Sequence, residues 1–183
     1  MTAAPGEHAH LALALANSRR NDPTGPVDEL ASAATMRAWL EGHDLGGDET
    51  AVDALRELRE AVREVLVARI EDRVPDPAAV SALNAAAAAA PAAPRLIWTD
   101  SPRATRDHLG EDRARALIAG DAIGLVTGPE HADLRACSAP GCVRLLLKDH
   151  PRRHWCSTRC GDRVRASRYY HRHRGASAAA PER

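Results

Sequence analysis

The chain has 183 residues with no Phe, three Trp and two Tyr, a length that allows one ordinary domain and a small additional module. A core so poor in aromatic residues excludes a large aromatic sheet and favours packed helices built from Leu, Val, Ile and Ala, so we expect a mainly α fold. The formal net charge of zero has two opposed parts, because residues 1–134 carry 13 Arg and 22 Asp or Glu (−9) while residues 135–183 carry 11 Arg, one Lys and 3 Asp or Glu (+9), which suggests an anionic partner for the C-terminal part.

The first thirty residues predict a short buried element followed by a loop. Residues 1–10 are expected to be a disordered N-terminus. Alternation of Leu and Ala at 11–16 fits a helix or a strand, and we favour a helix because Ala is the best helix former. This run is too short and lacks the basic flank of a signal peptide, and no stretch approaches the roughly 18 apolar residues of a membrane span. We therefore expect a cytoplasmic protein with no membrane contact.

A loop is predicted over residues 17–26 from their Asn, Asp, Pro and Gly content. Asn17, Ser18 and Arg19 stand at the end of the first helix and are candidates for a small-molecule pocket. The alternative is a capped helix end with solvated arginines. A small-molecule effector of the N-terminal part and a second copy of the chain, in a homodimer, are candidate partners.

Three further helices and one strand are expected between residues 32 and 110. Ser32 or Thr35 can cap a helix that ends before Gly42. Apolar residues at three- and four-residue steps predict a long helix over 49–72, capped by Asp48 or Thr50. Asp76 and Pro77 begin a helix that runs through the Ala tract to Pro91. Residues 95–100 read as a strand whose partner would come from 101–110 or from the end of the domain. A last helix is predicted over 111–126, ended by Gly128 and Pro129.

Four cysteines fall in two pairs, Cys137/Cys142 and Cys156/Cys160. Pairs at such spacings in a chain expected in the cytoplasm are typical of a zinc site rather than of disulfides. The Pro-Gly dipeptide inside the first pair predicts a tight turn followed by a strand over 143–147. In the second pair, the residues after Cys156 can cap a helix with Cys160 in its first turn.

A turn-borne pair joined by a hairpin to a pair at a helix start is the treble-clef arrangement, and we expect one zinc ion bound by four sulfurs. His150 or His154 could replace one sulfur, and simple buried thiols or an oxidised pair are further alternatives. A closed four-thiolate site has no open position for water, so the metal is expected to be structural and the protein is not expected to be an enzyme. The module has few large apolar residues, so zinc would supply much of its folding energy.

A basic helix with polar residues on nearly all of its sides is predicted after Cys160. At 100° per residue Arg165, Arg168 and Arg172 share one face, with Tyr and His residues interleaved. We expect phosphates of nucleic acid to be bound by Arg152, Arg153, Arg163, Arg165, Arg168 and Arg172. Arg144, Lys148 and Arg159 are expected to extend this basic surface. A solvated basic tail, or docking of the tail on the acidic N-terminal part, is the alternative.

The C-terminal motifs resemble those of the CGNR zinc-finger family. They read Cys137-Ser-Ala-Pro-Gly-Cys142, Arg152-Arg-His-Trp-Cys-Ser157 and Cys160-Gly-Asp-Arg163. Asp162 departs from the Asn of the family motif, keeping the acceptor, losing the amide donor and adding a negative charge. The N-terminal part is similar to the ABATE domain that precedes this finger, through L-A-L-A-L-A-N-S at 11–18 and M-R-A-W-L at 36–40. The resemblance implies a stress-related transcription regulator with a sensory or interaction domain and a DNA-binding finger.

These observations predict an α-rich ABATE-like domain with a small β element over 11–134, a treble-clef-like finger over 135–174 and a disordered tail over 175–183. The function we expect is a zinc-containing, DNA-binding transcription regulator. Two alternatives are a protein-interaction module whose basic finger docks on acidic protein surfaces, and a treble-clef nuclease prompted by His150 and His154. The nuclease would require a general base and a second, open metal site.

Overall fold

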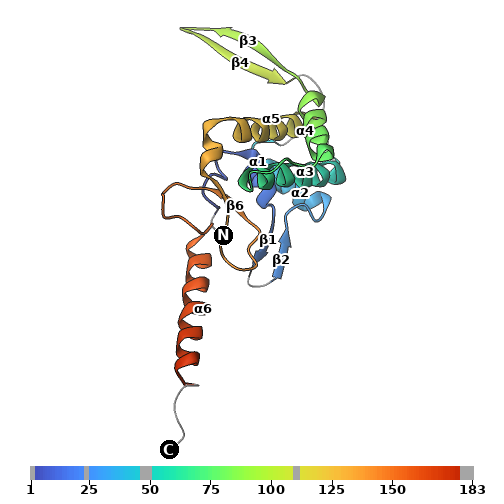
Figure 1. The fold of residues 1–183 in the computed structure, drawn as a ribbon. Coiled ribbons are helices and arrows are strands. Elements are labelled where there is room, and N and C mark those ends of the chain that lie inside the picture. The colour runs from blue at the N-terminus through green and yellow to red at the C-terminus, as the bar shows by residue number, and fades with distance from the viewer. Residues whose placement is uncertain (1–2, 23–24, 46–50, 109–111, 178–183) are drawn as a thin grey trace, which may run out of the picture.

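The computed structural model describes residues 3–22, 25–45, 51–108 and 112–177. Within these residues the fold is mainly α with small β-hairpins, as the composition predicts (Figure 1). The helices are α1 (Leu11–Asn17), α2 (Ala33–Glu41), α3 (Val52–Ile70), α4 (Pro77–Ala89), α5 (Arg113–Thr127) and α6 (Thr158–Ser177), with a 3-10 turn at Pro129–Asp133. The strands are β1 (Arg19–Asp22), β2 (Gly25–Asp28), β3 (Ala92–Trp98), β4 (Pro102–His108), β5 (Leu134–Ala136) and β6 (Leu145–Leu147).

The helical body packs α1 against α3 and α5, with α4 covering both longer helices (Figure 1). Helix α1 is almost wholly buried, which confirms the helix expected at 11–16. The predicted stripe of α3 is also confirmed, since Leu55, Val62 and Leu66 are fully buried. Many contacts in this core are made by Ala, so the helices can approach closely although the chain has no Phe.

The predicted helix starts are realised by side-chain caps. Ser32 forms a capping box with Thr35 at the start of α2, and Asp76 accepts a hydrogen bond from the Ala78 amide with Pro77 at the first helical position of α4. The long helix begins at Val52, and the predicted caps Asp48 and Thr50 lie outside the described residues.

Two hairpins belong to the N-terminal part. The prediction of a loop over 17–26 is wrong, because β1 and β2 pair antiparallel there, with Arg20 bound to Glu29. The strand expected at 95–100 is confirmed as β3, which begins earlier, at Ala92, and of the two sources left open for its partner the structure has the first, since β4 lies within 101–110. This β3–β4 ribbon projects from the body (Figure 1), and Leu96 and Trp98 on it are 65% and 70% exposed.

The N-terminal segment is ordered from residue 3, in contrast to the frayed end expected over 1–10. Ala4 is buried in the core of the cysteine module, and the Pro5 carbonyl accepts a hydrogen bond from the Leu147 amide on β6. Glu7 binds Arg144 and Asn17 through its carboxylate. Leu147 and Arg144 lie far along the chain from Pro5 and Glu7, so no local sequence pattern predicts these two contacts.

The C-terminal module combines the β5–β6 hairpin with α6. Leu134 of β5 and Leu145 of β6 belong to the main hydrophobic core, so the hairpin packs on the helical body. Helix α6 extends away from the body and continues to Ser177, into the tail predicted to be disordered from 175 (Figure 1). The remaining tail residues, 178–183, lie outside the described part. No described helix has both the length and the apolar character that a membrane span requires.

Candidate metal centre and basic helix

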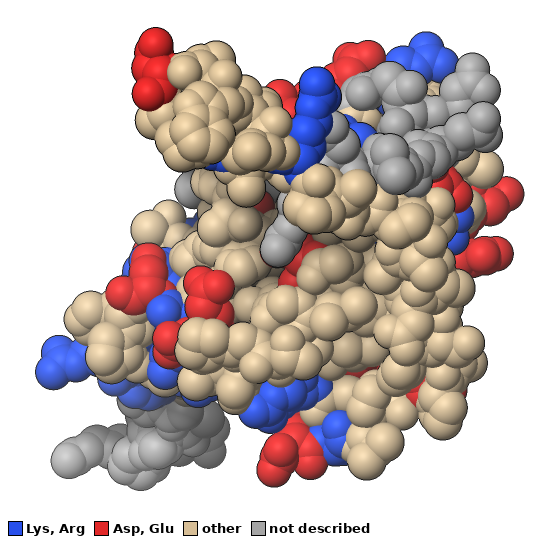
Figure 2. Space-filling view, turned by 90° about the horizontal axis from the view of Figure 1, so that it is seen from above, with Lys and Arg blue, Asp and Glu red and all other residues tan. Residues whose placement is uncertain are grey.

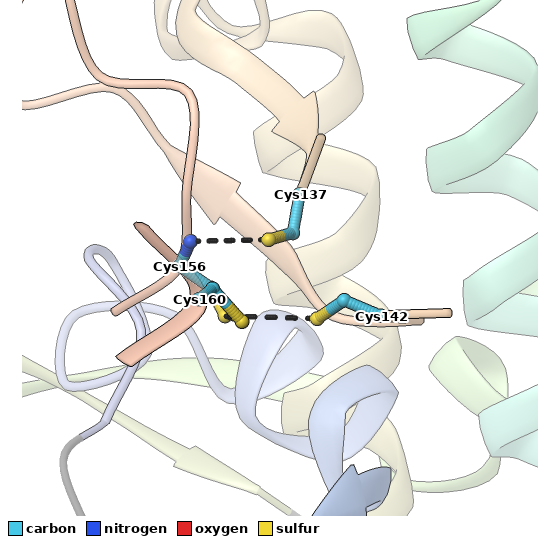
Figure 3. Close-up of side chains that lie close together, drawn as sticks. All are labelled: Cys137, Cys142, Cys156 and Cys160. Carbon is cyan, nitrogen blue, oxygen red and sulfur yellow. Dashed lines mark hydrogen bonds between the residues drawn. The ribbon is translucent and has the colours of Figure 1, made fainter. Parts of the chain in front are cut away.

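The four cysteines converge from the hairpin and from the start of α6 (Figure 3). Cys137 follows β5 and Cys142 precedes β6, with the predicted turn between them closed by Gly141 at a φ of +72°. Cys156 precedes α6, and Cys160 lies in the first turn of this helix. All four Sγ atoms lie within 4.8 Å of one another.

Local hydrogen bonds fix the second pair. The Cys156 amide donates to the Cys137 Sγ at 3.4 Å, which links the two pairs (Figure 3). The Cys160 amide donates to the Ser157 Oγ at 3.3 Å, so Ser157 caps α6 and holds Cys160 in its first turn, as predicted. The Cys156 sulfur lies 3.7 Å from the sulfurs of both Cys142 and Cys160.

Such crowding shifts the pKa values of three of these thiols in opposite directions. Hydrogen bonds from Cys142 and Cys156 lower the pKa of the Cys137 thiol to about 2. The hydrogen bond to Cys137 raises the pKa of Cys142 to about 11, and the pKa of Cys156 is raised for the same reason. One thiolate therefore holds its neighbours protonated, and a divalent cation at the same point would take the place of those protons.

This donor set fits zinc. Four clustered sulfurs are the ligand set of closed structural sites, and among the described residues the cluster contains only these four cysteines, so neither His150 nor His154 belongs to it. The Nδ1 of His150 instead accepts a hydrogen bond from the Arg152 amide. The site can bind one zinc ion, which would leave no coordination position open for water. A small apolar cluster surrounds the cysteines, with Ala4, Leu146 and Val164 buried in it and Trp155 packed against it.

Helix α6 touches the rest of the molecule only near its start. Val164 is buried in the cluster around the cysteines, whereas every residue from Arg165 to His173 is exposed. Over these residues the helix is therefore exposed on all sides and is not covered by the described part of the acidic body. The predicted residues Arg163, Arg165, Arg168 and Arg172 all lie on it. Its carboxylate Asp162 is bound by Arg165 at 2.6 Å.

Beside the helix start, a cleft of about 280 Å³ brings Arg152 and Arg153 to the same side as Arg165. The Arg165 guanidinium lies over the Trp155 ring, 5.6 Å from its centroid, in a cation–π contact. Gly161 makes this stacking possible, because a Cβ there would lie 2.9 Å from the ring atom Cε3 of Trp155. Arg153 is also held by Asp149 through two hydrogen bonds.

The end of the molecule opposite α6 differs in charge. Seen from above in Figure 2, Asp and Glu side chains alternate with Lys and Arg between broad areas of other residues. No comparable concentration of one sign is visible on that face.

The structure gives different surroundings to the three residues proposed for a ligand pocket, Asn17, Ser18 and Arg19. Asn17 is 3% exposed and binds the backbone of Leu145 in the hairpin of the cysteine module. Ser18 is buried, donates to the Leu15 carbonyl and accepts from Arg59. Arg19 is exposed and pairs with Glu60. Of the three, Asn17 lies on the wall of a cavity that Arg20 and Arg144 also line.

Arg144 does not belong to the basic surface, in contrast to the expectation from sequence. It is buried, and its Nη2 donates to both oxygens of Glu7 at 2.7 and 2.8 Å. Arg63 of α3 adds a second connection by donating to the carbonyls of Ala16 and Val143. The cysteine module is therefore locked to the helical body by buried polar contacts that the sequence did not indicate.

Comparison with known protein families gives two matches in the expected order. The model of the ABATE family, described as "Putative stress-induced transcription regulator", matches residues 9–129. The model described as "CGNR zinc finger" matches residues 134–173. Both resemblances noted in the sequence are confirmed. No curated protein matches the chain at a significant level.

Proposed function

The chain belongs to the ABATE family and carries a CGNR zinc finger, and from this premise we propose that it is a transcription regulator that binds DNA through α6. The zinc ion is structural in this proposal, and the protein is not an enzyme. The helical body acts as the sensory or recruiting part. We place the protein in the cytoplasm, where paired thiols hold metal rather than form disulfides.

One observation carries the DNA-binding proposal: α6 is a long, arginine-rich helix exposed from Arg165 to His173, and none of the helices and strands that the structure describes makes extensive contact with it. A helix that is polar all round gains little from its own fold, and closely spaced arginines repel one another in water. Phosphates would remove that repulsion. The exposed rings of Tyr169 and Tyr170 are placed to contact sugars or bases beside them.

The zinc ion and the interlock with the body would hold α6 at a fixed angle. Because Val164 is anchored in the cluster around the cysteines, the first turns of α6 keep their position while the rest of the helix remains available to DNA. Arg152, Arg153 and Arg165, gathered at the cleft, would bind phosphates at the start of the helix.

The test is fluorescence anisotropy with a labelled DNA duplex and the full, zinc-loaded chain over a range of salt concentrations. The logarithm of the binding constant is expected to fall with the logarithm of salt concentration, with a slope of about −0.9 per phosphate neutralised. Replacing Arg168 and Arg172 together by Ala should weaken binding and reduce the magnitude of the slope by about 2.

A matched control is the double substitution of Arg37 and Arg113, which are exposed on the helices of the body. These changes remove the same charge but should leave the slope unchanged. Binding that does not depend on salt, or equal effects of both double substitutions, would count against DNA binding through α6. If DNA does not bind and an acidic polypeptide does, the finger is a protein-interaction module instead.

A further inference from the structure

A polar cavity lies where the helical body meets the cysteine module. It measures about 400 Å³ and lies between the N-terminal segment, α1, β1, α2 and the hairpin residue Arg144. This volume falls within the range of about 300 to 1,000 Å³ that is typical of small-molecule sites. Small side chains on its wall, among them Ala3 and Ala14, leave the space open.

One wall of the cavity is aromatic. Trp39 and His43 stack with their ring centroids 4.3 Å apart, and the His43 Nδ1 is fixed by the Trp39 carbonyl at 2.7 Å. Trp39 is buried in the main core, so this wall is rigid. A rigid flat surface of this kind suits a flat, unsaturated ligand.

The charged side chains on the cavity wall differ in how many of their polar atoms have a hydrogen-bond or ion-pair partner. Glu7 accepts hydrogen bonds from Asn17, Arg144 and the Ala4 amide, so both of its oxygens are in use. Arg20 binds Glu29 through Nη1 at 2.7 Å, while its Nη2 donates to no described residue and its buried Nε has only the Asp22 carboxylate, at 3.8 Å. Arg20 therefore has donors to spare, and a guanidinium is a strong partner for carboxylates.

We propose that this cavity binds a small aromatic carboxylate, with its ring against Trp39 and His43 and its carboxylate on Arg20. The inference rests on the proposed function in one respect, since it assigns the sensory role of the body to this site. Glu29 shares Arg20 with the ligand through Nη1, so the carboxylate would be held along the remaining edge of the guanidinium. The site includes only Asn17 of the residues that the sequence suggested for a pocket.

The same cavity reaches the cysteine module. Asn17, Glu7 and Arg144 lie on its wall and also form the contacts that lock the module to the body. A ligand seated there would restrict these side chains and stabilise the docked finger. Occupancy of the cavity would thus be transmitted to α6 through the hairpin that carries Arg144 and Leu145.

The experiment uses benzoate as the probe, with benzamide as its neutral counterpart of similar shape. Isothermal titration of the full, zinc-loaded chain is expected to show benzoate binding with one site and much weaker binding of benzamide. Equal binding of the two compounds, or no binding of benzoate, overturns the proposal. DNA is absent from this titration, so its outcome is independent of DNA binding.

Two adjacent arginines of β1 supply the matched variants. Arg20→Gln should weaken benzoate binding by about tenfold or more, as expected for loss of a charged hydrogen bond. Arg19→Gln, which changes an exposed residue paired with Glu60, should leave benzoate affinity unchanged. Zinc content and the unfolding midpoint of both variants establish that each is folded. Equal affinities of the two variants would place benzoate elsewhere.

A further variant tests the aromatic wall of the cavity and leaves its charged side chains unchanged. His43→Ala is expected to weaken benzoate binding while leaving Arg20 paired with Glu29, and unchanged affinity in this variant overturns the proposed ring position. Hydrogen exchange completes the test, because benzoate should slow exchange of the amides of Leu145 and Leu147 in the parent chain. Binding of benzoate without DNA binding would refute the proposed function and leave this site standing.

Discussion

Asn17, the last residue of α1, makes a reciprocal pair of hydrogen bonds with the backbone of Leu145, which lies 128 positions later on β6. Its Nδ2 donates to the Leu145 carbonyl and its Oδ1 accepts from the Leu145 amide, both at 2.8 Å. One side chain thus satisfies both polar groups of a buried residue in another part of the chain. The end of a helix in the body thereby serves as a partner for a strand of the zinc finger.

Replacing Asn17 by Ala is expected to destabilise the protein by about 3 kcal/mol, because two buried backbone groups of Leu145 would lose their partners. Urea unfolding of the zinc-loaded chain measures this change. Asn21→Ala is the control, since exposed Asn21 also bonds the finger, at the Gly141 carbonyl, but water can replace it there. A similar loss for both variants would contradict the role assigned to Asn17.

Removal of zinc should disorder the N-terminal segment together with the finger. Ala4 is buried in the cluster around the cysteines, and Pro5 is bonded to Leu147, so the segment loses its contacts when the metal no longer holds that cluster. Hydrogen exchange after chelation should accelerate at Ala4 and Leu147 and remain slow in α3 and α5. Persistent protection of Ala4 in the chelated chain would show that the segment folds without the finger.

Acid is expected to weaken the contact between α3 and the β1–β2 hairpin. Buried Arg59 donates to both oxygens of Asp28, at 2.6 and 3.0 Å, and this hydrogen bonding lowers the pKa of the Asp28 carboxyl. A lowered pKa in the folded state means that the stabilisation is complete above the unfolded value of about 3.9 and is lost as the pH falls through the folded pKa.

Asp28→Asn should therefore cost about 2 to 3 kcal/mol at pH 7, and the difference from the parent chain should shrink as the pH falls below about 4. Unfolding free energies of both proteins, measured from pH 7 to pH 3, give this difference directly. Asp53→Asn serves for comparison, because the Asp53–Arg56 pair is exposed. A difference between parent and Asp28→Asn that stays constant with pH would refute the assignment.

Asp162→Asn restores the residue of the family motif and is expected to strengthen DNA binding by about 2- to 5-fold, the effect of removing one exposed negative charge. The carboxylate now binds Arg165 and competes with phosphate for it. Anisotropy titrations of both proteins at the same salt concentration measure the change. Weaker binding by the variant would mean that Asp162 positions Arg165 for contact instead of withholding it.

Gly161→Ala should destabilise the finger by about 1 to 3 kcal/mol through overpacking, since the new Cβ would meet the Trp155 ring. Zinc affinity measured by competition with a chelator is expected to fall in this variant. Ala166→Gly, at an exposed position of the same helix, controls for helix propensity and should leave zinc affinity near that of the parent. Unaltered zinc affinity in Gly161→Ala would show that Trp155 moves freely.

The sequence was a good guide where structure is local or periodic. The stripe of α3, the capped starts of α2 and α4 and the β3–β4 pairing follow from spacing and from turn residues. The cysteine cluster follows from spacing in the same way, because each pair is aimed by a turn or a helix start close to it in the chain.

The sequence was a poor guide where a polar residue is satisfied by a distant partner. The β1–β2 hairpin consists of polar and turn-forming residues and so reads as a loop, although its strands are paired. Arg144 stands among exposed arginines and is itself buried, because Glu7 neutralises it from the other end of the chain. Such pairs depend on tertiary packing, which no single stretch of sequence contains.

The pairing of Glu7 with Arg144 also sets an order of events during synthesis. The partners are separated by 137 positions, so at about 5 to 20 residues per second the ribosome needs roughly 7 to 27 s to supply the second after the first. Until then the N-terminal segment lacks the finger residues that it contacts in the folded chain. The helical body must therefore fold before these contacts can form. Docking of the N-terminal segment on the finger is therefore a late, long-range folding step. Its rate should depend on how soon the newly synthesised finger binds zinc.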